Sequence, residues 1–314
     1  MWGITMYNES LKFQFIEQED KDSRRRWLTW MFERTEPLEE AASKDICQMN
    51  LEELTGIFKL VSGNKTVSRI TAQTALRTYC RWCISQGVEG ANDLTDQLDM
   101  KDLEPYRKRM LANPQHMLKL LNEHFDDASE GTIHIIYRAY LWMAYFGMFD
   151  DQAIDVKMSE VSLSRLIIKT GGEEFEICRE AIPDFEWLVK KESFNYKHPL
   201  YNNVIVRQRV PGDRLLRGVR GQTTNKSIKA HIGKRLNPSP EEDYPPTISS
   251  IRLSGLYYRT LQREQIGMQP SFRANVRRII MHRNGGAEPM QHNIVTQARH
   301  MNRDYELWKE AFRV

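Results

Sequence analysis

The segment from Arg207 to Arg235 is rich in basic side chains and contains a single acidic residue, Asp213. Guanidinium and ammonium groups gathered in this way neutralise phosphate charges, so the segment predicts binding to a polyanion. The stretch FRANVRRIIMHR, residues 272–283, is a second basic concentration. A solvated surface without a partner stays the alternative for either cluster taken alone. The basic residues of the first segment are Arg207, Arg209, Arg214, Arg217, Arg220, Lys226, Lys229, Lys234 and Arg235.

Thiols are the other side chains whose spacing suggests chemistry. Cys80 and Cys83 form a CxxC pair inside the apparent helix TAQTALRTYCRWCISQG, while Cys47 and Cys178 lie far from it in the sequence. No second CxxC and no nearby HxxxH completes a four-ligand zinc site. We therefore expect reduced thiols packed in a core, without a metal or a cofactor, and a metal or redox role is the alternative.

The composition fits a globular protein of two ordinary domains. The chain has 314 residues, of which 40% are hydrophobic, and a mean hydropathy of -0.59. A net charge of +3 is by itself weak evidence for a polyanionic partner. The N-terminus lacks the pattern of a secretory signal, and the longest apolar stretches are shorter than the roughly 20 residues that span a bilayer. The expected location is cytoplasmic, with no membrane partner.

Helical patterns follow one another through the N-terminal part of the sequence. Residues 1–45 are predicted to form a helical extension, and residues 46–125 an all-α domain. The stretch that starts at Thr66 or Ser68 has apolar residues at helical spacing and ends at SQGVEGAN, whose glycines and asparagine favour a helix stop. The segment DDASEG, residues 126–131, interrupts these patterns, so we place the domain boundary there.

Residues 126–314 show a different order of elements. The strongly apolar helix TIHIIYRAYLWMAYFGM is followed by VSLSRLIIKTGGEEFEIC, which predicts a β-hairpin turning at residues 169–172. A helix at DFEWLVKKES, a loop with VPGDR, the basic helix NKSIKAHIGKRL and the breaker-rich NPSPEEDYPP come next, and three helices end the chain. The predicted fold class is mainly α with a small β-hairpin or sheet, an α+β protein.

This order of elements resembles the tyrosine recombinases and phage integrases. The most specific local likeness is GQTTNKSIKAHIGKRL followed by YPPTISSIRLSGLYYRTLQ, which is similar to the stretch leading into the family's histidine-arginine box. TVSRITAQTALRTYCRWCISQG, with LTDQLDMKDLEPYRKRM after it, resembles helices of the family's core-binding domain. The resemblance implies a SAM-like core-binding domain in residues 46–125 and a catalytic-type domain in residues 126–314, which close around one DNA duplex.

Several positions that match the family's catalytic residues hold other side chains. In that family a tyrosine attacks the phosphodiester, arginines stabilise the pentacoordinate phosphate and a lysine protonates the leaving oxygen. Here Phe149 stands where the first arginine is expected. Ser249 replaces the histidine of the His-x-x-Arg box, whose arginine matches Arg252. His282 is the nearest candidate for the late histidine, and Lys169 matches the hairpin lysine, for which a solvated turn residue is the alternative.

Tyr305 lies where a nucleophile could stand near the C-terminus. Its spacing to Trp308 and Phe312 equally suits an apolar helix face, which we favour. Three hypotheses follow. The leading one is a protein with a degenerate active site and no enzymatic activity. The alternatives are an active recombinase that uses Tyr305, Arg252 and Lys169, and a helical interaction module with no nucleic-acid role.

The leading hypothesis is a sequence-specific, double-stranded DNA-binding transcriptional regulator. Integrase-fold repressors that maintain lysogeny in the SPbeta group of Bacillus phages are relatives of this kind, and the chain resembles them. The resemblance implies a phage or prophage repressor that associates with the bacterial nucleoid. It implies a DNA operator as partner, and we expect a phage-encoded antagonist protein or peptide. Monomeric and dimeric binding are both left open.

Basic side chains from both domains are expected to contact DNA phosphates and grooves. Arg77 and Arg81 are four residues apart, so they share one face of a helix. The expected DNA-binding residues are Lys65, Arg69, Arg77, Arg81, Lys169, Lys226, Lys229, Lys234, Arg235 and Arg252.

Overall fold

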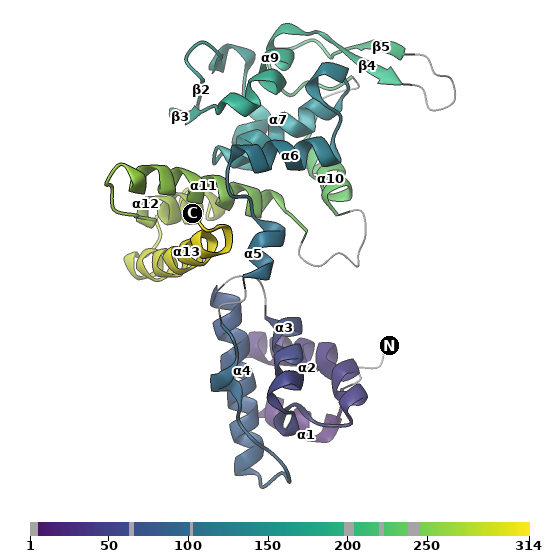
Figure 1. Cartoon of the computed structure of the whole chain (residues 1–314), viewed down its shortest axis with the longest axis vertical. Helices are drawn as coiled ribbons and strands as arrows, with labels where there is room; N and C mark the ends of the chain where they lie inside the picture. Colours follow the sequence, from purple (N-terminus) through teal and green to yellow (C-terminus); the bar gives the residue numbers. More distant parts are fainter. Residues whose placement is uncertain (1–5, 63–65, 101–102, 198–203, 220–222, 238–244) are drawn as a thin grey trace. The chain divides into compact units, whose positions relative to one another are not determined.

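The computed structural model describes residues 6–62, 66–100, 103–197, 204–219, 223–237 and 245–314 (Figure 1). The chain forms two compact units. The first comprises residues 1–102 with 287–304, and the second comprises residues 103–286 with 305–314. Helices dominate and the strands are short and antiparallel, so the predicted fold class is confirmed.

Among the described residues of the first unit, every element of regular secondary structure is a helix. Its helix α3 begins with a capping box, because the Asn50 side chain accepts from the Glu53 backbone N–H at 3.0 Å and the Glu53 carboxylate accepts from the Asn50 N–H at 2.9 Å. The long helix α13 belongs to this unit only as far as Asp304. The elements are α1 (Glu9–Glu17), α2 (Asp22–Ala42), η1 (Ile46–Gln48), α3 (Leu51–Val61), α4 (Thr66–Ser85), η2 (Thr95–Gln97) and the start of α13 (Gln291–Phe312).

Helices α1 and α2 share one core with α3 and α4. The Phe15 ring of α1 meets Tyr79 of α4 with ring centroids 5.1 Å apart, and Phe32 of α2 lies 4.9 Å from the same tyrosine. Beside them, the Lys12 ammonium contacts the Glu39 carboxylate at 2.6 Å, and both side chains are fully buried. The sequence suggested a separate extension over residues 1–45. Instead, Phe15 of α1 and Phe32 of α2 are buried against Tyr79 of α4.

The second unit combines helices with two small sheets. Met117 and Leu121 of α6, and Phe125 directly after it, are buried in the same core as α7, so the division suggested near residue 126 falls inside this unit. The elements are α5 (Glu104–Arg109), α6 (Pro114–His124), η3 (Ala128–Glu130), α7 (His134–Tyr145), α8 (Asp150–Asp155), η4 (Met158–Glu160), β1 (Val161–Ser162), β2 (Ile167–Thr170), β3 (Glu173–Glu176), η5 (Arg179–Ala181), α9 (Ile182–Lys190), β4 (Ser193–Lys197), β5 (Val204–Gln208), α10 (Asn225–Leu236), α11 (Ile248–Gln265), α12 (Arg273–Arg283) and the end of α13.

The predicted hairpin is present and is part of a three-stranded sheet. Strands β2 and β3 pair with Lys169 opposite Glu174, and β1 adds to β2. Gly171 and Gly172 make the turn with φ angles of 57° and 78°, which favour glycine. A second hairpin, β4 with β5, was not predicted.

Helix α7 is the centre of the second core. Its described side chains from Ile135 to Tyr145 are all buried. Arg138 and Trp142 both donate to the carboxylate of Asp184 on α9, at 2.7 and 2.8 Å. Helix α11 crosses α7 at Gly255, where an added Cβ would lie 1.8 Å from the Tyr145 carbonyl oxygen. This crossing needs glycine, and it fixes the register of α11 on α7.

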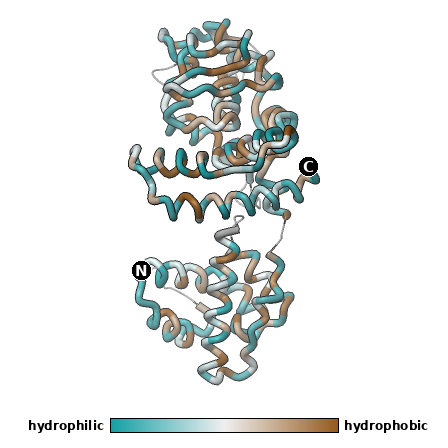
Figure 2. The backbone as a smooth tube through the Cα atoms, turned by 90° about the vertical axis from the view of Figure 1, so that its left-hand side faces the viewer, coloured by the Kyte–Doolittle hydropathy of each residue, from teal (hydrophilic) through white to brown (hydrophobic). Residues whose placement is uncertain are grey.

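Polar and apolar positions are interspersed along the helices of both units (Figure 2). Such mixing is expected of amphipathic helices that bury one face each. Within the described ranges, no helix combines the length and the apolar character needed to cross a membrane.

Candidate functional site

Helix α7 ends in a turn that fixes the position of Phe149. Gly147 adopts a φ of 99°, and an added Cβ there would lie 2.9 Å from a guanidinium nitrogen of Arg259. Phe149 then precedes α8, and its backbone N–H donates to the Gln152 side chain at 3.0 Å. The short sequence FGMFDDQ therefore sets Phe149 and Asp150 next to each other at the start of α8.

The Asp150 carboxylate lies between two basic side chains from other helices. Its Oδ1 accepts from the Arg252 Nη2 of α11 at 2.6 Å, and its Oδ2 accepts from the Lys229 Nζ of α10 at 2.6 Å. Arg252 also donates through Nε to the Met148 carbonyl at 2.8 Å. Burial alone would raise the pKa of Asp150, but the hydrogen bond from Lys229 and the charge of Arg252 outweigh it and lower that pKa.

The Phe149 ring is surrounded by cationic and aromatic groups. The His282 imidazole of α12 stacks on it with centroids 3.8 Å apart and planes 2° apart. The guanidinium groups of Arg278 and Arg252 lie 4.8 and 5.5 Å from the ring centroid. These are cation–π distances. We call this group the Phe149 cluster, which comprises Phe149, Asp150, Lys229, Arg252, Arg278 and His282.

Acidic side chains lie next to each basic residue of the Phe149 cluster. Besides the two contacts of Asp150, Arg278 pairs with Glu173 of β3 at 2.6 Å, and the His282 Nε2 lies 3.6 Å from Asp151. Asp150, Glu173 and Asp151 were not singled out from the sequence. Their pairing leaves the cluster with little net positive charge to attract a phosphate.

Helix α10 carries four of the ten predicted DNA-binding residues. The helix begins at a Thr224 cap, and Lys226 and Lys234 are exposed. Among the residues that the structure describes, neither of these lysines has an acidic partner. Arg235 is exposed too, and its Nη2 contacts the His134 Nε2 at 3.1 Å. With Lys229, which is exposed as well, the helix therefore presents four basic side chains to solvent.

The predicted residues of α4 differ in their availability. Arg69 is buried, stacks over Phe58 at 5.0 Å and donates to the Asp99 carbonyl at 2.7 Å, so it supports the core of the first unit. Its burial argues against a direct phosphate contact. Arg77 pairs with Asp96, and Arg81 pairs with Asp93 at 2.7 Å while 61% of its side chain stays exposed. Lys65 lies outside the described residues.

Lys169 and Tyr305 differ in exposure. The Lys169 side chain is exposed and pairs across the hairpin with Glu174 at 3.1 Å. Tyr305 is fully buried, and its hydroxyl donates to the Glu264 carboxylate at 2.6 Å. Burial and this hydrogen bond raise the pKa of Tyr305. Its ring stacks on Trp308, which agrees with the apolar helix face that we favoured.

Two of the basic residues between Arg207 and Arg235 are buried and bind acceptors within the protein. Arg209 is buried and donates to the carbonyls of Leu188, Lys191 and Leu215, and burial lowers its pKa to about 10. Arg217 is also buried, with Nη2 paired to Glu192 at 2.9 Å. The basic count therefore overstated the charge available to a polyanion.

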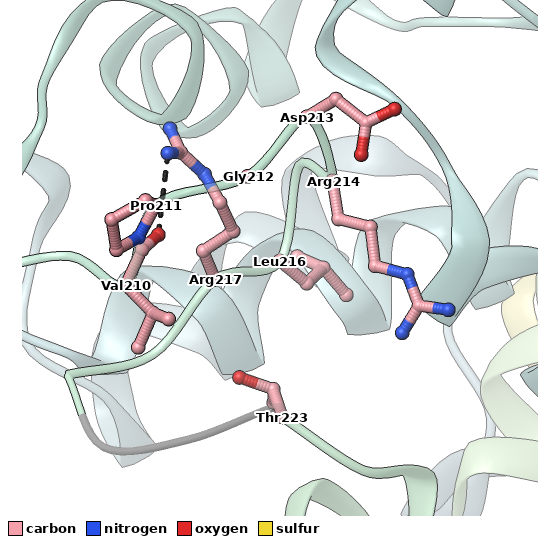
Figure 3. A pocket seen from close by; sticks show the side chains of 8 residues that line it. All are labelled: Val210, Pro211, Gly212, Asp213, Arg214, Leu216, Arg217 and Thr223. Carbon is pink, nitrogen blue, oxygen red and sulfur yellow. Dashed lines mark hydrogen bonds between the residues drawn. The ribbon is translucent and has the colours of Figure 1, made fainter.

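A pocket of about 160 Å³ lies beside this loop (Figure 3). The Arg217 Nη1 donates to the Val210 carbonyl at 3.4 Å. The Arg214 guanidinium points away from that carbonyl (Figure 3). The lining residues are Val210, Pro211, Gly212, Asp213, Arg214, Leu216, Arg217 and Thr223.

The thiols of Cys80 and Cys83 are buried in the first core, as expected. The fold adds a proximity that the spacing hid, since the ligand atoms of Asp45, Cys47 and Cys83 lie within 4.8 Å of one another. The Asp45 carboxylate already accepts from the Tyr79 hydroxyl at 3.0 Å and from the Cys47 N–H at 3.2 Å. Among the residues that the structure describes, these three form the group whose ligand atoms are close enough together to hold a metal ion.

Comparison with known proteins gives a match to one family model and matches to several solved structures. Residues 6–86 match the family model described as MrpR, N-terminal core-binding domain, so α1 and α2 lie within the matched region. The Tn1549 transposon integrase in complex with circular intermediate DNA is 15% identical over 85% of this chain and 89% of that chain, with a TM-score of 0.33. An arginine-to-lysine variant of that integrase, in complex with another such DNA, gives the same values. No curated protein matches the chain.

Proposed function

We propose that this chain is a sequence-specific, double-stranded DNA-binding transcriptional regulator with a tyrosine-recombinase-like architecture and no recombinase activity. The observation that carries the proposal is the Phe149 cluster. It gathers basic side chains as a phosphate site would, yet an aromatic ring fills its centre and Asp150 occupies two of its cations.

The cluster is poorly suited to phosphoryl transfer. An apolar ring at position 149 offers no hydrogen-bond donor to a phosphoryl oxygen, and removal of a single such donor typically costs roughly 10²- to 10³-fold in rate. The candidate nucleophile is not accessible either, because the Tyr305 hydroxyl is occupied by Glu264 in a buried position. Both features support lost catalysis.

Binding to a duplex makes weaker demands than cutting it. Affinity comes from many phosphate contacts, so a few missing ligands at one phosphate change it little. The exposed face of α10, with Lys226, Lys234 and Arg235, supplies such contacts. The match of residues 6–86 to a core-binding domain model adds support from the first unit.

The finer proposal is a phage or prophage repressor that maintains lysogeny, similar to the integrase-fold repressors of the SPbeta group. Such a repressor has to be released from its operator when the phage is induced. A phage-encoded antagonist protein or peptide is therefore part of the proposal.

A suicide substrate tests the loss of catalysis. A duplex nicked near the candidate operator traps a covalent protein–DNA adduct if any tyrosine attacks, and denaturing gels reveal the adduct. We expect none with the full chain. An adduct that disappears in Tyr305→Phe would instead establish an active recombinase with an unusual site.

Gel shifts over a salt series and mapping of bound sites in the native host test the regulator. We expect binding that weakens steeply with salt, since counterions are released from the duplex. Bound sites should lie at promoters and remain unrecombined. Absent or salt-insensitive binding would favour a helical interaction module.

A further inference from the structure

The Asp150 carboxylate forms ion pairs with both Lys229 and Arg252. No other described contact joins these two basic side chains. Lys229 of α10 holds one carboxylate oxygen and Arg252 of α11 holds the other, each at 2.6 Å. The arrangement is partly accessible, since 27% of the Asp150 side chain, 48% of the Lys229 side chain and 21% of the Arg252 side chain are exposed. A ligand that approaches from solvent could therefore reach both cations.

The cations are those that bind phosphate best in proteins. A guanidinium and an ammonium each donate charge-assisted hydrogen bonds to separate oxygens of one phosphodiester. A carboxylate carries the same single charge over two oxygens. We propose that Lys229 and Arg252 form a binding site for a backbone phosphodiester of duplex DNA, and that Asp150 occupies this site as an internal competitor. This inference rests on the proposed DNA binding.

The surroundings allow an exchange of Asp150 for a phosphate. Arg252 keeps its orientation without Asp150, because its Nε donates to the Met148 carbonyl at 2.8 Å and its guanidinium lies over the Phe149 ring. Lys229 is a long, exposed side chain that can follow a new anion. Asp150 itself is the first residue of α8, where rotation of the side chain leaves the helix intact.

The competitor should lower affinity and make it less sensitive to salt. A phosphate that enters has to displace the Asp150 carboxylate. One anion then replaces another beside Lys229 and Arg252, and the number of anions paired with these two cations does not increase. Once the carboxylate is gone, the incoming phosphate is neutralised by free cations and more counterions are released. Each added phosphate neutralisation steepens the slope of log K against log salt by about 0.9.

The decisive variant is Asp150→Asn, which removes the charge and keeps the shape. We expect this full-length variant to bind a fixed duplex about tenfold more tightly than wild type at low salt, with a slope steeper by about 0.9. The matched control is Asp155→Asn at the other end of α8. Asp155 pairs at 2.7 Å with Arg214, outside the Phe149 cluster. This control removes the same charge and should change binding much less.

The double variant Asp150→Asn with Lys229→Gln separates site binding from general charge. We expect it to lose most of the gain, because one of the two released cations is absent. A gain of equal size in Asp155→Asn, or one that persists in the double variant, would overturn the inference. Thermal unfolding of each variant shows whether it is folded at the assay temperature.

The outcomes also distinguish this inference from the proposed function. Wild-type binding with no gain in a folded Asp150→Asn protein overturns the competitor alone. No duplex binding by any of the four proteins overturns both. A gain confined to Asp150→Asn establishes that the site takes a phosphate of the duplex.

Discussion

The imidazole of His282 stacks face to face on the phenyl ring of Phe149, with centroids 3.8 Å apart. The pair brings the end of α12 to the start of α8 and closes one side of the ring. Arg278 and Arg252 lie near the same ring. Phe149 therefore acts as an apolar centre around which cationic side chains pack, in the place where the recombinase resemblance expects an arginine.

Substitution of Phe149 should show that the position requires an apolar ring. Phe149→Leu is expected to reduce the free energy of unfolding by about 1–2 kcal/mol, because part of the packing is kept. Phe149→Arg should cost about 3 kcal/mol or more, since it places a further cation beside Arg252 and Arg278. Urea unfolding measures both. An arginine variant as stable as the leucine variant would show that the position does not require an apolar ring.

Removing the positive charges of α10 should weaken binding to DNA of any base sequence. Lys226→Gln and Lys234→Gln are each expected to reduce the slope of log K against log salt by about 0.9 if the lysine contacts a phosphate. The matched control is Lys119→Gln on α6, whose side chain is 76% exposed. Gel shifts over a salt series give the slopes. Equal effects in all three variants would mean that overall charge, not this helix, sets the affinity.

The buried ion pair of the first unit should be costly to break from one side. Lys12→Met leaves the Glu39 carboxylate buried without its cation, and such losses typically cost about 3–5 kcal/mol. Adding Glu39→Gln should recover a large part of the stability, because the amide that replaces the carboxylate carries no charge. Urea unfolding of the single and double variants measures the recovery. A double variant less stable than Lys12→Met would contradict this account.

The same carboxyl makes stability depend on pH. Burial raises the pKa of Glu39 from 4.5 to about 7, although Lys12 opposes the shift. Between these two values the folded chain holds a proton that the unfolded chain has released, so the free energy of unfolding should decrease as pH rises through this window. Unfolding curves across the window, compared with those of Glu39→Gln, isolate the contribution. Parallel pH profiles of the two proteins would rule it out.

Local signals in the sequence predicted much of the fold. The strongly apolar stretch TIHIIYRAYLWMAYFGM located α7, the basic stretch NKSIKAHIGKRL located α10, and Gly171 with Gly172 located the turn between β2 and β3. Each of these signals acts over a few neighbouring residues. The basic character of α10 and of residues 272–283 also pointed to regions that contribute to the Phe149 cluster.

Features that depend on distant partners were not predicted. Arg69, Arg209 and Arg217 look like surface cations in the sequence, but carbonyl and carboxylate acceptors elsewhere in the chain allow them to be buried. Asp150 looks like an ordinary acid at a helix start until α10 and α11 bring Lys229 and Arg252 to it. Tertiary pairing decides which charges remain available.

The crossing of α7 and α11 at Gly255 gives this protein a reference point for comparison with distant relatives. Sequence identity is low between such proteins. At Gly255, however, the backbone contact leaves no room for a methyl group, which restricts this position to glycine. Relatives that keep this crossing should therefore carry glycine three residues after the counterpart of Arg252. An alignment anchored there would show directly which side chain each relative places at the position of Phe149.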